Sequence, residues 1–182
     1  MNSMTCVHTS GRPTASPLTA TLRDIVGQCV ADVATAAGCG LLLLTTDGRR
    51  ITSVATDPLA ERLNVLHDSH RENPFRAAWS GLTAVGAEQS TESSRWPSWM
   101  ACARELGAQS VLTSALNTRE RSLGVVMVYS TLPMAFDAED HGTLETVAKR
   151  AALVIDEAQN ERTSVLISRS RISNVSGSAI TI

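Results

Sequence analysis

The segment from Leu123 to Asp140, LGVVMVYSTLPMAFDAED, constrains the fold of this chain more than any other. Its first part, Gly124 to Tyr129, is apolar and rich in β-branched residues, which favours a central strand covered on both faces. Pro133 ends any strand because it has no N–H to donate to a β-ladder. Asp137 then predicts the N-cap of a helix, with Asp140 at the third helical position near the positive end of the helix dipole. The segment predicts a buried strand, a turn and a capped helix in succession.

Composition indicates a water-soluble globular domain. The chain has 182 residues, 43% of them hydrophobic and 19% charged, which is enough for one domain with a core. A net charge of −2 gives no general attraction to nucleic acid or to an anionic membrane, so such binding needs a local patch. The aliphatic run Leu41 to Leu44 is too short to span a bilayer, and residues 1–17 lack the apolar core of a signal peptide. We expect a cytoplasmic protein with no membrane contact.

The first part of the chain predicts an arm, a helix and a hairpin. Residues 1–17 are rich in Thr, Ser, Pro and Gly and predict a disordered N-terminal arm. Apolar residues between Leu22 and Val33 recur at helical spacing and predict an amphipathic helix. Leu41 to Thr45 and Ile51 to Ala55 predict two antiparallel strands joined by an Asp-Gly turn.

The middle of the chain is less regular. Asp57 followed by Pro58 predicts a helix start. Residues 71–99 then form an irregular region that holds all three tryptophans, with a short strand at Thr83 to Ala87. Pro97 predicts the first turn of a helix that ends at Gly107.

The last part predicts a second hairpin and a long helix. Ser110 to Leu116 and Ser122 to Ser130 form the hairpin, and the helix runs from Ala138 to about Arg162. That helix is longer than a core contact requires, so its far half packs against the first helix, a partner subunit, or both. The fold class is therefore α+β, a mostly antiparallel sheet of about five to six strands with helices on its faces and long N- and C-terminal helices packed together.

This order of elements, with the Leu123 to Asp140 segment, resembles a GAF domain of the actinobacterial type in which GAF precedes ANTAR, an RNA-binding module. Three shorter segments carry the same resemblance: Arg95 to Pro97 before a helix, Arg104 to Gly107 leading into Ser110 to Leu112, and Ala55 to Asp57 after the second strand. The resemblance implies a GAF-like domain over residues 18–160. It also implies a non-enzymatic sensory or signalling module of a bacterial cytoplasmic regulator, which binds a small ligand or a protein partner. We expect a homodimer formed through the first and last helices.

The tail, residues 161–182, resembles the opening of ANTAR. The similar residues are Leu166, Ser168, Arg169, Ile172, Val175, Gly177 and Ile180. ANTAR has three helices, whereas the residues from Asn160 onward can form at most one, so the resemblance implies a truncated or degenerate ANTAR. The alternative function is an RNA-binding transcription antitermination regulator in which Arg169 and Arg171 contact phosphates. Two or three arginines supply few such contacts, and the opposing interpretation is an exposed flexible tail.

The GAF resemblance also implies a ligand cavity between the sheet and the middle segment. Its candidate ligand-binding residues are Phe75, Trp79, Trp96 and Trp99, whose rings suit an apolar molecule. The alternative is that these rings fill the core under a long loop. GAF domains of this group usually carry a Gly-Glu-Gly-Pro-Cys-like run near this region, where this chain reads RENPF, so the ligand of those relatives is not carried over.

No residue pattern indicates catalysis, a metal or a cofactor. His67 and His70 share a helical face and could chelate, but we prefer a solvated helix end. Cys29 falls on an apolar helix face and predicts a buried structural thiol, while Cys39 and Cys102 are far apart in sequence and lack the cysteine cluster of GAF methionine sulfoxide reductases. A phosphate-binding glycine loop, HExxH and GxSxG are all missing. We expect no enzyme activity.

Overall fold

The computed structural model describes residues 17–81, 85–88 and 95–175, and it describes side chains at all of these except 86–88 and 162–175. The predicted N-terminal arm, apart from Pro17, and the last seven residues of the predicted tail lie outside this range.

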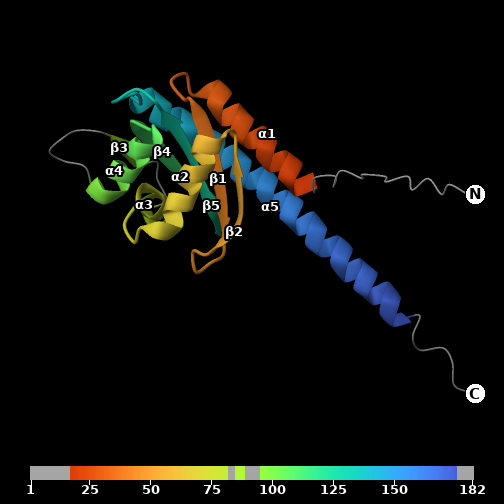
Figure 1. Cartoon of the computed structure of the whole chain (residues 1–182). Coiled ribbons are helices and arrows are strands. Elements are labelled where there is room, and N and C mark those ends of the chain that lie inside the picture. The colour runs from red at the N-terminus through yellow and green to blue at the C-terminus, as the bar shows by residue number, and fades with distance from the viewer. Residues whose placement is uncertain (1–16, 82–84, 89–94, 176–182) are drawn as a thin grey trace, which may run out of the picture.

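The centre of the fold is one antiparallel sheet with the strand order β2-β1-β5-β4-β3 (Figure 1). The strands are β1 (Gly38–Leu44), β2 (Arg50–Ala55), β3 (Val85–Glu88), β4 (Ser110–Asn117) and β5 (Ser122–Ser130). The predicted α+β class and antiparallel sheet are confirmed. β5 is the middle strand, and every residue from Leu123 to Ser130 is buried, as its apolar composition predicts.

Helices cover both faces of this sheet (Figure 1). One face carries α1 (Pro17–Asp32) and α5 (Ala138–Val175), and the other carries α2 (Pro58–Ser69), α3 (Pro74–Gly81) and α4 (Pro97–Leu106). α1 and α5 contact each other and run in opposite directions, so the predicted packing of the terminal helices is confirmed. Each face has its own hydrophobic core, because alternate residues of β1, β4 and β5 point to opposite sides.

The start of α5 follows the sequence prediction and its end does not. Asp137 Oδ1 accepts from the backbone N–H groups of Glu139 and Asp140 at 2.8 and 3.0 Å, and Asp140 Oδ2 accepts from the Asp137 N–H at 3.1 Å. These contacts form a reciprocal capping box. The predicted end near Arg162 is wrong, because α5 continues to Val175 as one helix of 38 residues. No glycine or proline interrupts the chain from Thr143 to Val175, so nothing in the backbone stops the helix earlier.

The middle segment is more regular than predicted, because α3 occupies part of it. Asn73 Oδ1 accepts from the Arg76 N–H at 2.9 Å, and Pro74 occupies the first helical turn. The Asn73 side chain is buried, and its Nδ2 donates to the carbonyls of His67 and His70 at the end of α2. Asn73 therefore starts α3 and joins it to α2. The Asn-Pro pair was the sequence signal for this helix.

The remaining predictions on this face agree with the structure. α2 has Asp57 as its N-cap, and α4 ends at Gly107, whose φ of 110° is a left-handed conformation that favours glycine. β3 begins at Val85, and the predicted start at Thr83 lies outside the described residues.

Candidate functional site

The four candidate aromatic side chains gather in the core under α2, α3 and α4. Phe75 and Trp99 are fully buried, with ring centroids 6.1 Å apart in an edge-on arrangement. Trp96 is buried at the start of α4, under the guanidinium of Arg95, which lies 5.3 Å from its ring centroid. Trp79 is partly buried on α3 and packs against the same core. A ligand could reach Phe75 and Trp99 only if this packing opened, whereas Trp79 already has an accessible edge.

The two histidines at the end of α2 have different surroundings. His67 is 2% exposed and its ring lies 5.7 Å from the Phe75 ring, so the predicted solvated position is wrong for this residue. Burial lowers the pKa of His67 below its ordinary value. His70 follows α2 and its Nε2 lies 3.8 Å from Cys102 Sγ. Across the described residues, no three His, Cys, Asp or Glu side chains are grouped so that they could hold a metal ion.

Asp57 is the centre of a hydrogen-bond network that joins β2, α2 and β5. Its Oδ1 accepts from the N–H groups of Leu59 and Ala60 and from the Tyr129 hydroxyl at 2.9 Å, and its Oδ2 accepts from the Thr56 hydroxyl at 2.7 Å. Burial acts to raise the pKa of Asp57, but these hydrogen bonds outweigh it and hold the pKa below the usual value. Burial and the hydrogen bond to Asp57 raise the pKa of Tyr129 to about 12. The sequence indicated the helix cap but not the role of Tyr129.

Two cysteines, one on α1 and one on β1, lie in the same core. Cys29 and Cys39 are both fully buried, which confirms the structural thiol predicted at Cys29. Burial raises the pKa of Cys39 well above its ordinary value, and contact with Cys29 raises it further. The raised pKa makes the Cys39 thiol a poor nucleophile at neutral pH.

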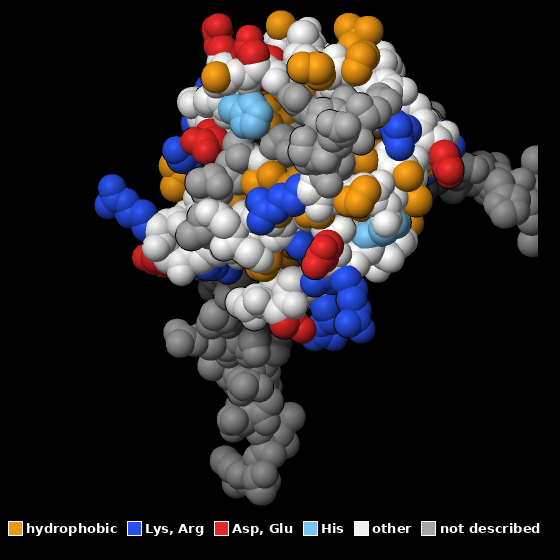
Figure 2. Space-filling view, turned by 90° about the vertical axis from the view of Figure 1, so that its left-hand side faces the viewer, with side chains coloured by type: hydrophobic (Ala, Val, Ile, Leu, Met, Phe, Trp, Pro, Cys, Tyr) orange, Lys and Arg blue, Asp and Glu red, His pale blue; other side chains and the backbone are white. Residues whose placement is uncertain are grey.

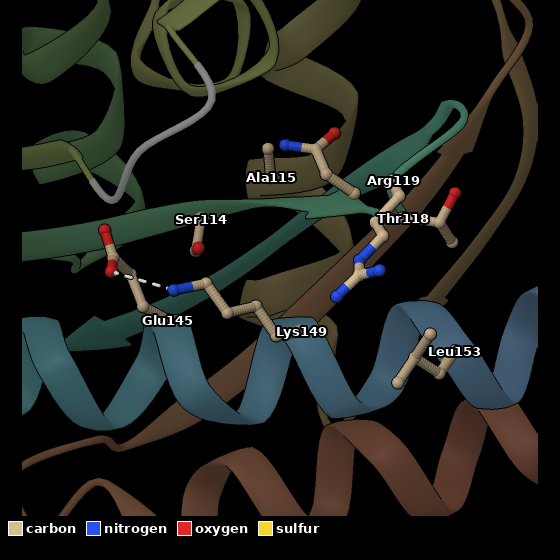
Figure 3. Close-up of a pocket in the computed structure, with 8 residues that line it drawn as sticks. Ser114, Ala115, Thr118, Arg119, Glu145, Lys149 and Leu153 are labelled. Atoms are coloured by element: carbon tan, nitrogen blue, oxygen red, sulfur yellow. Dashed lines mark ion pairs between the residues drawn. The ribbon is translucent and has the colours of Figure 1, made fainter.

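A hairpin–helix groove opens between the β4–β5 hairpin and α5 (Figure 3). It has a volume of about 410 Å³ and is lined by Ser114, Ala115, Asn117, Thr118, Arg119, Glu145, Lys149 and Leu153. Arg119 reaches from the hairpin toward α5, and Lys149 Nζ lies 3.6 Å from Glu145 Oε2 on the helix (Figure 3). Sequence reasoning missed this groove because its walls come from two segments that are distant in sequence and individually unremarkable.

A smaller α1–α5 groove of about 130 Å³ lies between the terminal helices. Its lining residues are Ile25, Gln28, Val147, Arg150, Ala151 and Val154. Val154 is 47% exposed there. An apolar side chain thus reaches the surface of α5 beside α1.

The surface seen in Figure 2 has basic and acidic side chains interspersed, with apolar side chains between them. This side of the described molecule therefore presents a mixed electrostatic field. The RNA-binding candidates Arg169 and Arg171 lie in the distal part of α5, and their side chains are outside the described set. Within the described part of the chain, no helix combines the length and apolar character needed to cross a bilayer.

Comparison with known proteins gives one family match. Residues 22–157 match the family model described as GAF domain. The match ends before the tail, so it gives no support for ANTAR. None of the curated proteins matches the chain.

Solved structures share this fold at low sequence identity. A domain of a putative two-component sensor histidine kinase from Sinorhizobium meliloti is 16% identical, covers 82% of this chain and 99% of its own, and has a TM-score of 0.59. The GAF3 domain of a Synechocystis protein in its photoproduct state is 13% identical, with coverages of 80% and 98% and a TM-score of 0.62. The second GAF domain of DevS from Mycobacterium smegmatis is 14% identical, with coverages of 81% and 99% and a TM-score of 0.56.

Proposed function

Since this chain belongs to the GAF domain family, we propose that it is a non-enzymatic sensory or signalling module that responds to a small ligand or a protein partner and transmits the response through α5. The similar structures include a domain of a sensor histidine kinase and a GAF domain in a photoproduct state, which supports a signalling role. The non-enzymatic part rests on the sequence, which carries no recognisable catalytic motif.

The observation that carries this proposal is the apolar stripe of α5. Positions 144, 147, 151, 154, 158, 161, 165, 168, 172 and 175 follow alternating steps of three and four residues, and eight of these ten residues are apolar. Such a heptad spacing is the pattern of a helix that packs against another helix along its length. Leu144, Val147 and Ala151 are buried against the sheet and α1, whereas Val154, the next residue of the stripe, is 47% exposed.

We propose that a second copy of the chain covers this exposed part, giving a homodimer through α1 and α5. The partly open α1–α5 groove and the exposed Val154 supply apolar surface for such an interface. A dimer of this kind aligns two long helices, each about 57 Å at 1.5 Å per residue, and lets them carry a change of packing away from the sheet.

The signal in this proposal is a shift between two packings of these helices. A ligand shifts that equilibrium only by the difference in its affinity for the two states. The aromatic cluster under α2, α3 and α4 remains the proposed ligand site, and Trp79 is the member with accessible surface. Because β5 contributes side chains to both cores, a rearrangement around Phe75 and Trp99 would reach the face that holds α5.

Analytical ultracentrifugation tests the dimer. At tens of micromolar the protein is expected to sediment as a dimer of a 19.4 kDa chain. A monomer at these concentrations would remove the interface from the proposal and leave the family membership standing.

The second candidate, an RNA-binding antitermination regulator, rests on the tail residues Arg169 and Arg171 and on the continuation of α5 to Val175. It is tested by electrophoretic mobility shift with a twin-hairpin leader RNA at several salt concentrations. Binding that weakens steeply with salt would support it, because phosphate contacts release counterions. Absent or salt-independent binding would reject it.

A further inference from the structure

We propose that the hairpin–helix groove is a second binding site, which takes a small monoanionic carboxylate with an apolar tail. The groove is distinct from the aromatic cluster because it lies on the opposite face of the sheet. Its helical wall is α5, whereas the aromatic cluster lies under α2, α3 and α4. The site therefore goes beyond the proposed function and stands independently of it.

Arg119 supplies the charge that selects an anion. The neighbouring basic groups already have partners: Lys149 pairs with Glu145, and Arg121 Nε donates to Asp156 Oδ1 at 2.8 Å. The Arg119 guanidinium makes no ion pair or hydrogen bond with the residues that the structure describes. The lining of the groove thus carries one uncompensated positive charge, and a planar guanidinium matches a carboxylate in a two-pronged contact.

Ser114 adds a polar group to the floor. Residues 112, 114 and 116 of β4 point to the α5 side, and Leu112 and Leu116 are fully buried there as core. Ser114 interrupts this apolar row, is only 3% exposed, and points its hydroxyl toward α5 (Figure 3). A serine hydroxyl can donate a hydrogen bond to a carboxylate oxygen.

The remaining walls favour an apolar tail and a single negative charge. Leu153 is exposed at the helical wall, and the methylene stem of Lys149 runs along the same side (Figure 3). The Glu145 carboxylate in the lining would repel a second negative charge, which disfavours a dianionic phosphate. The volume of about 410 Å³ lies within the range of small-molecule sites.

A bound carboxylate would connect the hairpin to α5. The Arg121–Asp156 pair already joins these two elements at the next turn of the helix, and Arg121 also donates to Gln159 at 3.1 Å. A ligand held by Arg119 and resting on Leu153 would extend this connection toward the start of α5. The site is thus placed to change how firmly the helix is held against the sheet.

The test is titration with 3-phenylpropionate, followed by amide chemical shifts in two-dimensional NMR. A ligand of this size is expected to bind in the low millimolar range. We expect shifts at residues 114–119 and 145–153. The neutral analogue 3-phenylpropanol, which has the same ring and chain length, should bind at least about tenfold more weakly, because charge-assisted hydrogen bonds to Arg119 are lost.

Two variants and a control separate the site from adventitious binding. Arg119→Gln should weaken binding of 3-phenylpropionate about tenfold or more, and Leu153→Gln should weaken it by removing apolar contact. Both residues are at the surface, so both variants should fold, which circular dichroism checks. Arg23→Gln makes the same charge change on the exposed face of α1 and should leave binding unchanged. Shifts confined to α2–α4, scattered weak shifts, or equal affinity for Arg119→Gln or for 3-phenylpropanol would each overturn the proposal.

Discussion

Asp57 performs three roles with one carboxylate: it caps α2, binds the end of β2 through Thr56 and accepts a hydrogen bond from Tyr129 of β5. These contacts bring together segments that are far apart in the chain. Gly38 lies against the same pair, and an added Cβ there would meet both Asp57 and Tyr129. The positions of these side chains are therefore set by contacts between segments that are distant in sequence.

Tyr129→Phe should lower the free energy of unfolding by about 1 to 2 kcal/mol at pH 7, because it removes one hydrogen bond to a charged group. The low pKa of Asp57 in the folded state means that its contribution is present above the ordinary carboxylate pKa and is lost as the pH falls through the folded value. Urea unfolding at pH 7 and under acid conditions measures both effects.

Asp57→Asn serves as the companion variant to Tyr129→Phe. Asparagine keeps a good N-cap acceptor but removes the charge, so the acid dependence assigned to this site should shrink while α2 remains capped. Unchanged stability of Tyr129→Phe at pH 7 would show that the hydroxyl contact contributes nothing.

Buried His67 predicts a pH effect nearer neutrality. Its folded pKa lies below 6.5, chiefly through burial, with Arg76 adding to the shift and Asp68 opposing it. The unfolded chain therefore takes up a proton first as the pH falls, and stability should decline from about pH 6.5 downward until the folded pKa is reached. Melting temperatures between pH 7.5 and 5.5 test this. His67→Phe should flatten the decline, and an identical pH profile in the variant would contradict the assignment.

For individual residues, the sequence predicted those roles that depend only on neighbouring positions in the chain. Asp57 and Asp137 were identified as caps because a cap depends on the next three residues. His67 was misplaced because its burial comes from Phe75 on α3, a helix that the sequence reasoning did not foresee. Tyr129 was not identified because its partner lies 72 positions earlier in the chain.

Among the elements, β5 is the strand on which the sheet depends. Gly124 faces Leu43 of β1 and Leu116 of β4, and a Cβ added there would clash with the carbonyl oxygen of Leu42. The backbones of β1 and β5 approach each other closely at this point, and only a glycine at position 124 avoids a clash.

Gly124→Ala should therefore destabilise the fold by about 1 to 3 kcal/mol, the usual cost of forced overpacking. Gly142→Ala is the matched control, because Gly142 lies in α5 and nothing is within 4 Å of the added Cβ. That change should stabilise the protein by about 0.5 to 1 kcal/mol, since alanine is the better helix former. Denaturant unfolding of the two variants compares them directly, and a Gly124→Ala protein as stable as the parent would show that β1 and β5 can move apart.

Hydrophobic periodicity predicted the strands and the amphipathic helices of this fold well. β1, β2, β4 and β5 lie close to the predicted ranges, because each is bounded by turn residues or glycines. α3 was not predicted, because its eight residues are too few to show a clear period, and its Asn-Pro start was read as part of an irregular region. The predicted end of α5 near Arg162 came too early, since no glycine or proline interrupts the chain from Thr143 to Val175.

For the whole molecule, we expect the apolar stripe of α5 to make two copies of the chain associate. Val154→Glu places a charge in the proposed interface and should weaken the dimer by at least about tenfold, since an unpaired charge would have to be buried. Ile51→Glu makes the same kind of change at another exposed apolar side chain, on the edge strand β2 and outside the α1–α5 groove, and should not alter association. Sedimentation velocity over a concentration series measures both. If Val154→Glu and Ile51→Glu dimerised equally strongly, the interface would have to lie elsewhere.

The family was inferred from the order of elements and the Leu123 to Asp140 segment, and residues 22–157 match the GAF domain model. The four candidate aromatic side chains lie in one core cluster, yet the sequence could not predict how deeply Phe75 and Trp99 would be buried, since that depends on packing between three helices and the sheet. The hairpin–helix groove depends in the same way on tertiary contacts, here between β4 and α5.

The most direct measurement of the central claim, that α5 pairs with its copy as a signalling helix, is pulsed electron paramagnetic resonance on spin-labelled protein. Labels at Thr163→Cys or Ser170→Cys, in a background in which Cys6 and Cys102 are replaced by serine, occupy outward positions of the heptad. Two parallel helices packed 8–10 Å apart should give similar interspin distances at both sites, about 25 to 40 Å once the labels are included. Absence of a dipolar signal, or distances that differ by more than about 15 Å between the two sites, would contradict a parallel pairing of the helices.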